Sequence, residues 1–329
     1  MTPTRIILDT DPGLGAPGAD IDDGLAIALA LRSPEVVLEA LTIVVGNVDV
    51  QVGYANAGAL LARLGAGQVP VALGAGRPLV EDLAPLRALF DRHLPEAQRP
   101  TQRPPDPDGS GDAARLLVDL VMASPGEITI VAIGPMTNLA TAIALEPGFA
   151  AAVGELVLMA GAATTYAQNV TTVADFNAYA DPEALQMVLD SGAPVRMVGL
   201  DQTSRVLLDR GDAQRMRDGG DPFGVWAAEC TDAWIDFLGT AFPERPEHAD
   251  ACFLHDPLTV AAVIDPSLLT WAPAHVAVEL EGRIARGMAV ADRGLALMPP
   301  AGPPNAQVAI DTDVERFRSL FLDRMAVSR

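Results

Sequence analysis

The sequence predicts an α/β protein whose open, doubly wound and mostly parallel sheet carries helices on both faces. Short β-branched runs alternate with alanine- and leucine-rich stretches along the 329 residues, and this order is typical of βαβ units. Half of the residues are apolar and 20% are charged, so the chain can bury a large core. We find no repeat period and no clean linker, and we therefore expect a single domain over residues 1–329.

The strands are expected where β-branched and other apolar residues cluster, and the helices between them. Strands are predicted at Arg5–Asp9, Leu38–Val45, Ile128–Ile133, Leu156–Met159, Val195–Leu200 and Val308–Ile310. Helices are predicted at Asp22–Arg32, Val52–Leu64, Asp112–Ala123, Asn138–Leu145 and Pro182–Asp190. The last helix has a clear start, because Asp181 suits the N-cap and Pro182 the first helical position.

One stretch departs from this alternation. Residues 77–111 are rich in proline and carry few strand signals. We expect a surface excursion there, and a lid over the functional site is the alternative interpretation.

The charge balance excludes several partners. The chain carries 43 acidic and 22 basic side chains, a formal net charge of −21, which argues against nucleic acid and anionic membranes because both are polyanions. No apolar run reaches the roughly 18 residues of a transmembrane helix, and the N-terminus lacks the pattern of a secretory signal. Two cysteines, Cys230 and Cys252, suit a reducing compartment. We therefore expect a cytoplasmic protein.

Every basic residue is an arginine, since the chain contains no lysine. P-loop chemistry needs a lysine on the phosphates, and Schiff-base chemistry needs a lysine amine. Both mechanisms are therefore excluded.

Carboxylates gather where the first strand should end. They are Asp9, Asp11, Asp20, Asp22 and Asp23. Ligands of open parallel sheets bind beyond the carboxyl ends of the strands, and carboxylates that converge there repel one another. No basic residue lies in the segment, so we expect a hard divalent cation with oxygen ligands, Ca²⁺ or Mg²⁺. The alternative is that Asp20 or Asp22 caps the following helix.

Further polar groups follow the later strands. Asn47, Asn169, Asp175 and Asn177 suit the hydroxyls of a sugar, which both donate and accept hydrogen bonds. His255 stands beside Asp256 and is a candidate general acid, with Asp256 a further metal ligand. The alternatives are a turn role for Asn47 and a structural role for His255.

Six motifs occur in order between residues 7 and 266. They read ILDTDPG, DIDDGLAIALAL, VVGN, AIGPMTNLA, QNVTTVADFNAYADPEA and HDPLTVAAVIDP. Together they resemble the inosine-uridine type nucleoside hydrolase family. The resemblance implies a Ca²⁺-dependent enzyme that hydrolyses the N-glycosidic bond of ribonucleosides, built as a homo-oligomer, a dimer or tetramer.

The resemblance also implies roles for individual residues. Asp11 would be a metal ligand and the base that activates water. Asp23, Asp256 and the backbone carbonyl of Met136 would complete the metal ligands. His255 would face the nucleobase as the leaving-group acid. The ribose hydroxyls would be bound by Asp22, Asn47, Asn169, Asp175 and Asn177.

The sequence departs from the family pattern in three places. Residues 14–21 separate DPG from DD, where most members have a single residue. Asp175 stands where the family usually has glutamate. The histidine-glycine pair that usually follows the third strand region is missing.

Two other functions are compatible with the residues. A phosphatase of the haloacid dehalogenase type would also place Asp9 and Asp11 after a strand, but the rim motifs offer no basic residue for the phosphate. A nonhydrolytic, metal-dependent ribose- or nucleoside-binding protein would keep the same contacts. The wall that faces the base is expected from the segment Trp226 to Phe242. Trp234 and Phe237 could stack on a base there, but their helical spacing favours a place in the core.

Overall fold

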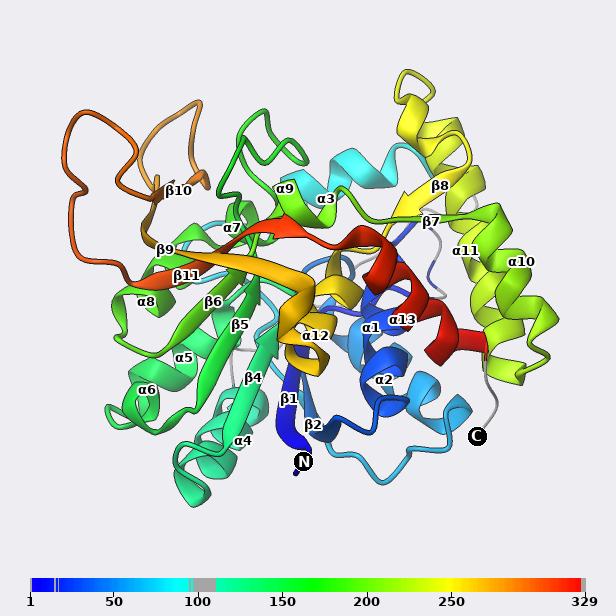
Figure 1. Cartoon of the computed structure of the whole chain (residues 1–329), viewed down its shortest axis with the longest axis horizontal. Coiled ribbons are helices and arrows are strands. Elements are labelled where there is room, and N and C mark those ends of the chain that lie inside the picture. Colours follow the sequence, from blue (N-terminus) through cyan, green and yellow to red (C-terminus); the bar gives the residue numbers. More distant parts are fainter. Residues whose placement is uncertain (1, 15, 17, 95, 97–110, 327–329) are drawn as a thin grey trace.

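The computed structural model describes residues 2–14, 16, 18–94, 96 and 111–326. A nine-stranded sheet crosses the molecule (Figure 1). Its strands are β1 (Thr4–Thr10), β2 (Val36–Ile43), β3 (Val71–Leu73), β4 (Ile128–Ala132), β5 (Glu155–Met159), β6 (Val195–Val198), β9 (Leu269–Val278), β10 (Ala289–Asp292) and β11 (Ala306–Thr312). A second, two-stranded sheet pairs β7 (Leu207–Asp209) with β8 (Ala251–Phe253).

The order of the strands locates the functional rim. The large sheet runs β10-β9-β11-β6-β5-β4-β1-β2-β3, and β1 pairs in parallel with both β2 and β4. The chain therefore winds outward from β1 in two directions, and the loops that leave β1 and β4 diverge. Doubly wound sheets bind their ligands in the crevice at such a switch point.

The last three strands complete the sheet on one side. β11 is parallel to β6, whereas β9 is antiparallel to β11 and to β10. The sheet is thus mostly parallel, as predicted, with an antiparallel extension that the sequence pattern did not indicate.

Helices cover both faces of the large sheet. On β1, Ile6 and Leu8 belong to one apolar core, and Ile7 belongs to the other, because successive side chains of a strand point to opposite faces. The first core holds α1 (Asp22–Leu31), α2 (Val50–Arg63), α10 (Arg210–Asp218), α11 (Pro222–Ala241), α12 (His255–Ile264) and α13 (Val314–Ala326). The second holds α4 (Gly111–Ala123), α5 (Thr137–Leu145), α6 (Phe149–Ala152) and α8 (Pro182–Asp190). This arrangement confirms the doubly wound α/β fold.

Short helices occupy the connections. They are α3 (Ala84–Asp91), α7 (Phe176–Ala180), α9 (Leu200–Thr203) and the 3₁₀ turns η2 (Pro246–His248) and η3 (Pro266–Leu268). Within the predicted proline-rich excursion, α3 is helical, while residue 95 and residues 97–110 lie outside the described residues. The start of α8 is as expected, since the Asp181 side chain accepts a hydrogen bond from the Ala184 N–H. Among the described helices, none is long and apolar enough to cross a membrane.

Candidate active site

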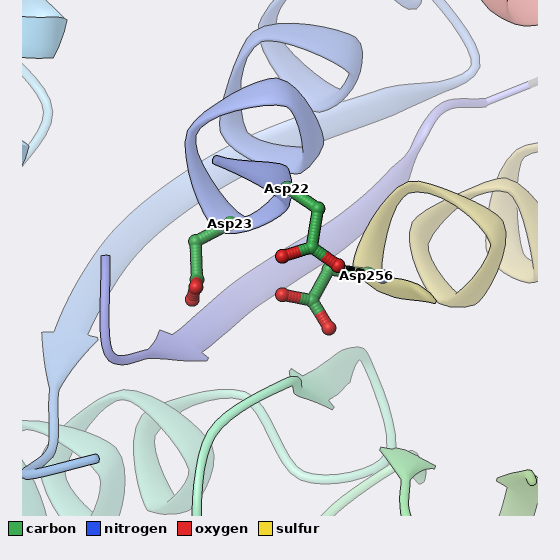
Figure 2. Close-up of side chains that lie close together, drawn as sticks. All are labelled: Asp22, Asp23 and Asp256. Carbon is green, nitrogen blue, oxygen red and sulfur yellow. Dashed lines mark hydrogen bonds between the residues drawn. The ribbon is translucent and has the colours of Figure 1, made fainter. Parts of the chain in front are cut away.

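The site lies at the carboxyl end of β1. β1 delivers Asp11 from its end, α1 begins with Asp22 and Asp23, and α12 carries Asp256 in its first turn. Figure 2 shows Asp22, Asp23 and Asp256 turned toward a common space, although Asp22 and Asp256 are 234 positions apart in the sequence. One oxygen from each of these three buried carboxylates lies within 4.8 Å of the others.

Asp23 is held in one orientation by neighbouring groups. Its Oδ1 accepts hydrogen bonds from the Thr10 hydroxyl (2.5 Å) and the Asp11 N–H (3.1 Å). Its Oδ2 accepts from Nδ2 of Asn47 (2.9 Å). The carboxylate is thereby fixed before any ligand arrives, and fixed groups bind with a smaller loss of conformational entropy.

Asp11 packs between two glycines. A Cβ at Gly46 would lie 1.8 Å from Asp11 Oδ2, and one at Gly134 would lie 2.8 Å from Oδ1. Oδ2 accepts a hydrogen bond from the Asn47 N–H (2.7 Å), whereas Oδ1 is buried and has no partner among the described residues. Buried carboxylate oxygens are normally paired, so Oδ1 has an open binding position.

Asp22 connects the two helices of the site. Its Oδ2 accepts a hydrogen bond from the Asp256 N–H (3.1 Å), so it satisfies a free donor at the start of α12. The alternative prediction that Asp20 or Asp22 caps α1 is wrong, because the N-cap residue is Ile21 and no side chain caps that helix. Asp20 instead accepts a hydrogen bond from the Ile21 N–H. Like Asp22, it lines a cavity beside the acidic cluster.

The electrostatics of the cluster are unfavourable as it stands. Burial, and then the neighbouring carboxylates, raise the pKa values of Asp22 and Asp256 well above their usual range. Burial and the charge of Asp23 do the same to the pKa of Asp11. The buried arginine of the cavity wall, Arg87, pairs with Asp49 instead. An oxygen-only donor set with unbalanced negative charge fits a hard divalent cation.

Polar groups on the neighbouring elements hold the side chain of Asp9 near the end of β1. The Asp9 Oδ1 accepts hydrogen bonds from the Thr42 hydroxyl (2.5 Å) and from Nδ2 of Asn138 (2.8 Å). Asn138 also accepts from the Ala75 N–H, which ties the loop after β3 to α5. Burial raises the pKa of Asp9 to about 7. These residues position the rim rather than line the cavity.

A cavity of about 900 Å³ opens from the acidic cluster. Such a volume lies in the range of small-molecule sites. Its lining includes five of the residues that the sequence assigned to a sugar, which are Asp22, Asn47, Asn169, Asp175 and Asn177. The structure therefore brings these five residues to one cavity.

Two of these residues differ in what they leave free. Asn177 donates both Nδ2 hydrogens, to the carbonyls of Ile133 (2.8 Å) and Met159 (3.0 Å), so only Oδ1 is available. Asp175 caps α7: its Oδ1 accepts from the Ala178 N–H and its Oδ2 from the Gly161 N–H. Asp175 thus has a structural role that the sequence interpretation did not include, beside its predicted contact with ribose.

The two remaining predicted residues are Met136 and His255. Met136 is fully buried before α5, and its carbonyl accepts the Ala140 N–H (3.0 Å), so its role as a metal ligand stays a prediction. His255 lines the cavity, and its Nδ1 lies 2.8 Å from the Thr203 hydroxyl. Burial lowers the pKa of His255 to about 4, so its imidazole is neutral at pH 7.

Sequence reasoning missed four residues of the site, which are Thr10, Thr203, Phe253 and His248. Thr10 and Thr203 hold Asp23 and His255, but isolated threonines carry no signal of such roles. The predicted aromatic wall exists in part, because Trp234 and Phe242 line the cavity, whereas Phe237 stacks behind on Trp234. His248 from η2 and Phe253 from β8 extend this wall.

Comparison with known proteins agrees with this geometry. Residues 6–319 match the family model described as inosine-uridine preferring nucleoside hydrolase. The pyrimidine-specific ribonucleoside hydrolase RihA of Citrobacter koseri is 34% identical over 327 residues, covering 98% of this chain and 97% of that protein. The probable uridine nucleosidase 2 of Arabidopsis thaliana is 33% identical and covers 98% of both chains.

Solved structures show the same relationship in three dimensions. A plant nucleoside hydrolase, PpNRh1, superposes with a TM-score of 0.83 at 33% identity over 99% of this chain and 100% of its own. A purine-preferring ribonucleoside hydrolase from Gardnerella vaginalis has a TM-score of 0.79 at 34% identity, over 98% of both chains. With the fold, the rim and the matched sequence in agreement, the chain belongs to the inosine-uridine preferring nucleoside hydrolase family, enzymes that hydrolyse the N-glycosyl bond of ribonucleosides.

Proposed function

We propose that this enzyme depends on Ca²⁺ and releases ribose from ribonucleosides, uridine among them. The observation that carries the proposal is the group of buried carboxylates at the end of a cavity lined by amides and rings. The similar proteins named for uridine and for pyrimidines support uridine as a substrate, and the purine-preferring relative makes purine ribosides the necessary comparison.

The residues present fit a calcium ion. Oxygens that share one Ca²⁺ lie at 2.3–2.6 Å from it and thus at most about 5 Å apart, and the carboxylates of Asp22, Asp23 and Asp256 meet that condition. We assign Asp11, Asp23, Asp256 and the Met136 carbonyl as ligands, with Asp22 beside them. When bound, the cation supplies positive charge and lowers the pKa of water.

The side chains of the cavity supply the base, orient the ribose and stabilise the positive charge that forms on it. Asp11, with Oδ1 unpaired, is the base that takes a proton from the attacking water. Asn177 Oδ1, Asn47 and Asn169 orient the ribose hydroxyls, and Asp175 and Asp22 complete the anionic surroundings. Positive charge grows on the ribose as the bond to the base breaks, and an anionic, preorganised pocket stabilises that charge.

His255 supports the departing base. The 2.8 Å contact between its Nδ1 and the Thr203 hydroxyl is shorter than the 3.5 Å contact of that hydroxyl with the Leu200 carbonyl. We therefore assign the hydroxyl hydrogen to the Nδ1 contact, which leaves the ring hydrogen on Nε2. This tautomer places an N–H toward the cavity, where it donates to the leaving base.

The experiment is a ribose-release assay on uridine, cytidine, inosine and adenosine, with and without exhaustive chelation. We expect ribose from uridine, loss of activity after chelation and recovery with calcium. Recovery with magnesium alone would overturn the choice of metal, and full activity in a verified metal-free preparation would overturn metal dependence. Binding of nucleosides without ribose release would favour the nonhydrolytic alternative.

A further inference from the structure

His248 is a polar residue of the cavity wall to which neither the sequence motifs nor the proposed chemistry gives a role. It ends η2, is 6% exposed and lines the same cavity as the acidic cluster. Its ring packs edge-on against Phe253 at 5.6 Å between centroids and is tilted toward Phe242 at 6.1 Å. The two phenylalanines therefore fix the plane of the imidazole.

The ring nitrogens of His248 lack protein partners. Nδ1 is buried without a hydrogen-bond partner among the described residues. Nε2 also has no partner among them, but it keeps accessible surface on a residue that lines the cavity. Buried polar groups without partners are rare, and each calls for a specific explanation such as a ligand.

The state of the ring follows from this environment. Burial lowers the pKa of His248, so the imidazole is neutral and carries a single N–H. An N–H enclosed without an acceptor is rarer in proteins than an unpaired acceptor. The hydrogen therefore belongs on Nε2, and His248 presents one donor to the cavity.

The neighbouring rings show which part of a substrate this donor meets. His255 lies next to the proposed metal ligand Asp256, and its ring packs tilted against Phe253 at 5.2 Å between centroids; the other ring that contacts Phe253 is His248. Going along the wall from the acidic cluster, His255 comes first and His248 follows one ring later. A base whose glycosidic bond lies at the cluster turns its remote edge toward His248.

We propose that His248 is a specificity-determining residue that donates a hydrogen bond from Nε2 to an oxo group on the remote edge of the nucleobase. The inference rests on the proposed function, because it needs ribose to lie at the acidic cluster. For uridine the acceptor is the 4-oxo oxygen. A base without an acceptor at that position leaves the donor unpaired, which is the strongest way for a site to reject a ligand.

The test compares two substrates and three proteins. Uridine and its 4-deoxy analogue, the riboside of pyrimidin-2-one, differ at the proposed acceptor. His248→Phe keeps a ring between Phe242 and Phe253 and removes the donor, and His248→Gln keeps a donor at a similar reach. We expect His248→Phe to lower kcat/KM for uridine by about 5–100-fold, the range for an unpaired buried group, and to change the analogue by less than about 2-fold. We expect His248→Gln to recover part of the loss.

The fold-loss in kcat/KM from wild type to His248→Phe is measured separately for uridine and for the analogue. The ratio of these two losses is independent of how well each base leaves, because each substrate is compared with itself. Hydrolysis of p-nitrophenyl riboside, which has no oxo group, reports whether the variants keep an intact ribose site. Equal losses on uridine and the analogue, or no loss on uridine, would overturn the assignment.

A binding measurement separates this inference from the proposed function. We expect free uracil to bind the wild-type protein more tightly than His248→Phe by a similar factor in calorimetry. If the wild type released no ribose, the proposed function would fail, and the uracil titration would still decide the role of His248: equal affinities would refute it.

Discussion

Asp256→Asn should separate two effects of the acidic cluster: charge repulsion, which destabilises the metal-free protein, and calcium binding, which stabilises it. The substitution keeps the size of the side chain and the backbone N–H that binds Asp22. Two ionised carboxylates about 4.8 Å apart repel by about 1 kcal/mol in water, and by about 3.5 kcal/mol at an effective dielectric constant of 20. Because their pKa values are raised, the metal-free protein either bears this repulsion or takes up a proton to avoid it. Replacing one carboxylate therefore stabilises the metal-free protein by up to about 3 kcal/mol.

The same substitution removes a metal ligand. A ligand at one hundred times its Kd stabilises the folded state by about 2.7 kcal/mol, and for domains of 150–250 residues 1 kcal/mol raises Tm by about 2–4 °C. We therefore expect calcium to raise the Tm of the wild type by about 5 °C. Metal-free Asp256→Asn should melt at or above the metal-free wild type and should gain under about 2 °C from calcium.

Thermal unfolding at pH 7, with and without calcium after exhaustive chelation, measures both effects. Asp181→Asn is the matched control, because Asp181 is equally buried but accepts hydrogen bonds from Thr137, Leu79 and Ala184. It should lower Tm in both conditions and keep the full calcium response. A lower metal-free Tm for Asp256→Asn together with a full calcium response would refute the assignment of this cluster as the metal site.

Three further predictions concern the proposed roles. Asp11→Asn should lower kcat by several orders of magnitude at any calcium concentration, whereas Asp23→Asn should recover in part at high calcium; equal recovery of both would contradict the separation of base from ligand. His255→Ala should slow uridine by about 10²–10⁴-fold and barely change p-nitrophenyl riboside, whose leaving group needs no help; parallel losses would mean that His255 only packs. Thr203→Val should lower kcat on uridine with little change in KM and Thr203→Ser should restore it, and a failure of Ser to do so would show that the hydroxyl does not orient the ring.

Most of the fold could be predicted from the sequence because its strands are short and consistently apolar. The runs at β1 and β4, for example, form strands within one residue of their expected ends. The antiparallel β9 and β10 escaped prediction. β9 alternates buried and more exposed residues, and it includes Pro273, which argues against an interior strand. Tertiary packing decides that β9 pairs with β11 in antiparallel orientation. A local sequence pattern carries no information on that pairing.

The candidate site was predictable to the extent that its residues were charged and clustered in the sequence. Asp22, Asp23 and Asp256 were all singled out, and the structure brings them together. The sequence could not show from which backbone N–H groups these carboxylates accept hydrogen bonds. Asp22 accepts an N–H from α12, and Asp175 accepts two from α7 and its surroundings, and these bonds depend on helices that meet only in the folded chain.

The insertion between the two acidic motifs shows why spacing alone is a weak guide to such sites. Residues 14–21 lengthen the segment that joins Asp11 to Asp23, yet the Asp11 N–H still donates to Asp23 Oδ1 at 3.1 Å. The described residues of this segment pack against the rest of the protein: Leu14 is buried and lies so close to Gly24 that a Cβ there would be 2.2 Å from its side chain, and Gly18 adopts a positive φ of 69° beside Leu94. The ends of the loop are fixed by β1 and α1, whose packing in the core sets the distance between the two carboxylates. Added chain length costs little when it leaves the anchoring elements in place, so the geometry of the site survives a change that obscures its motif.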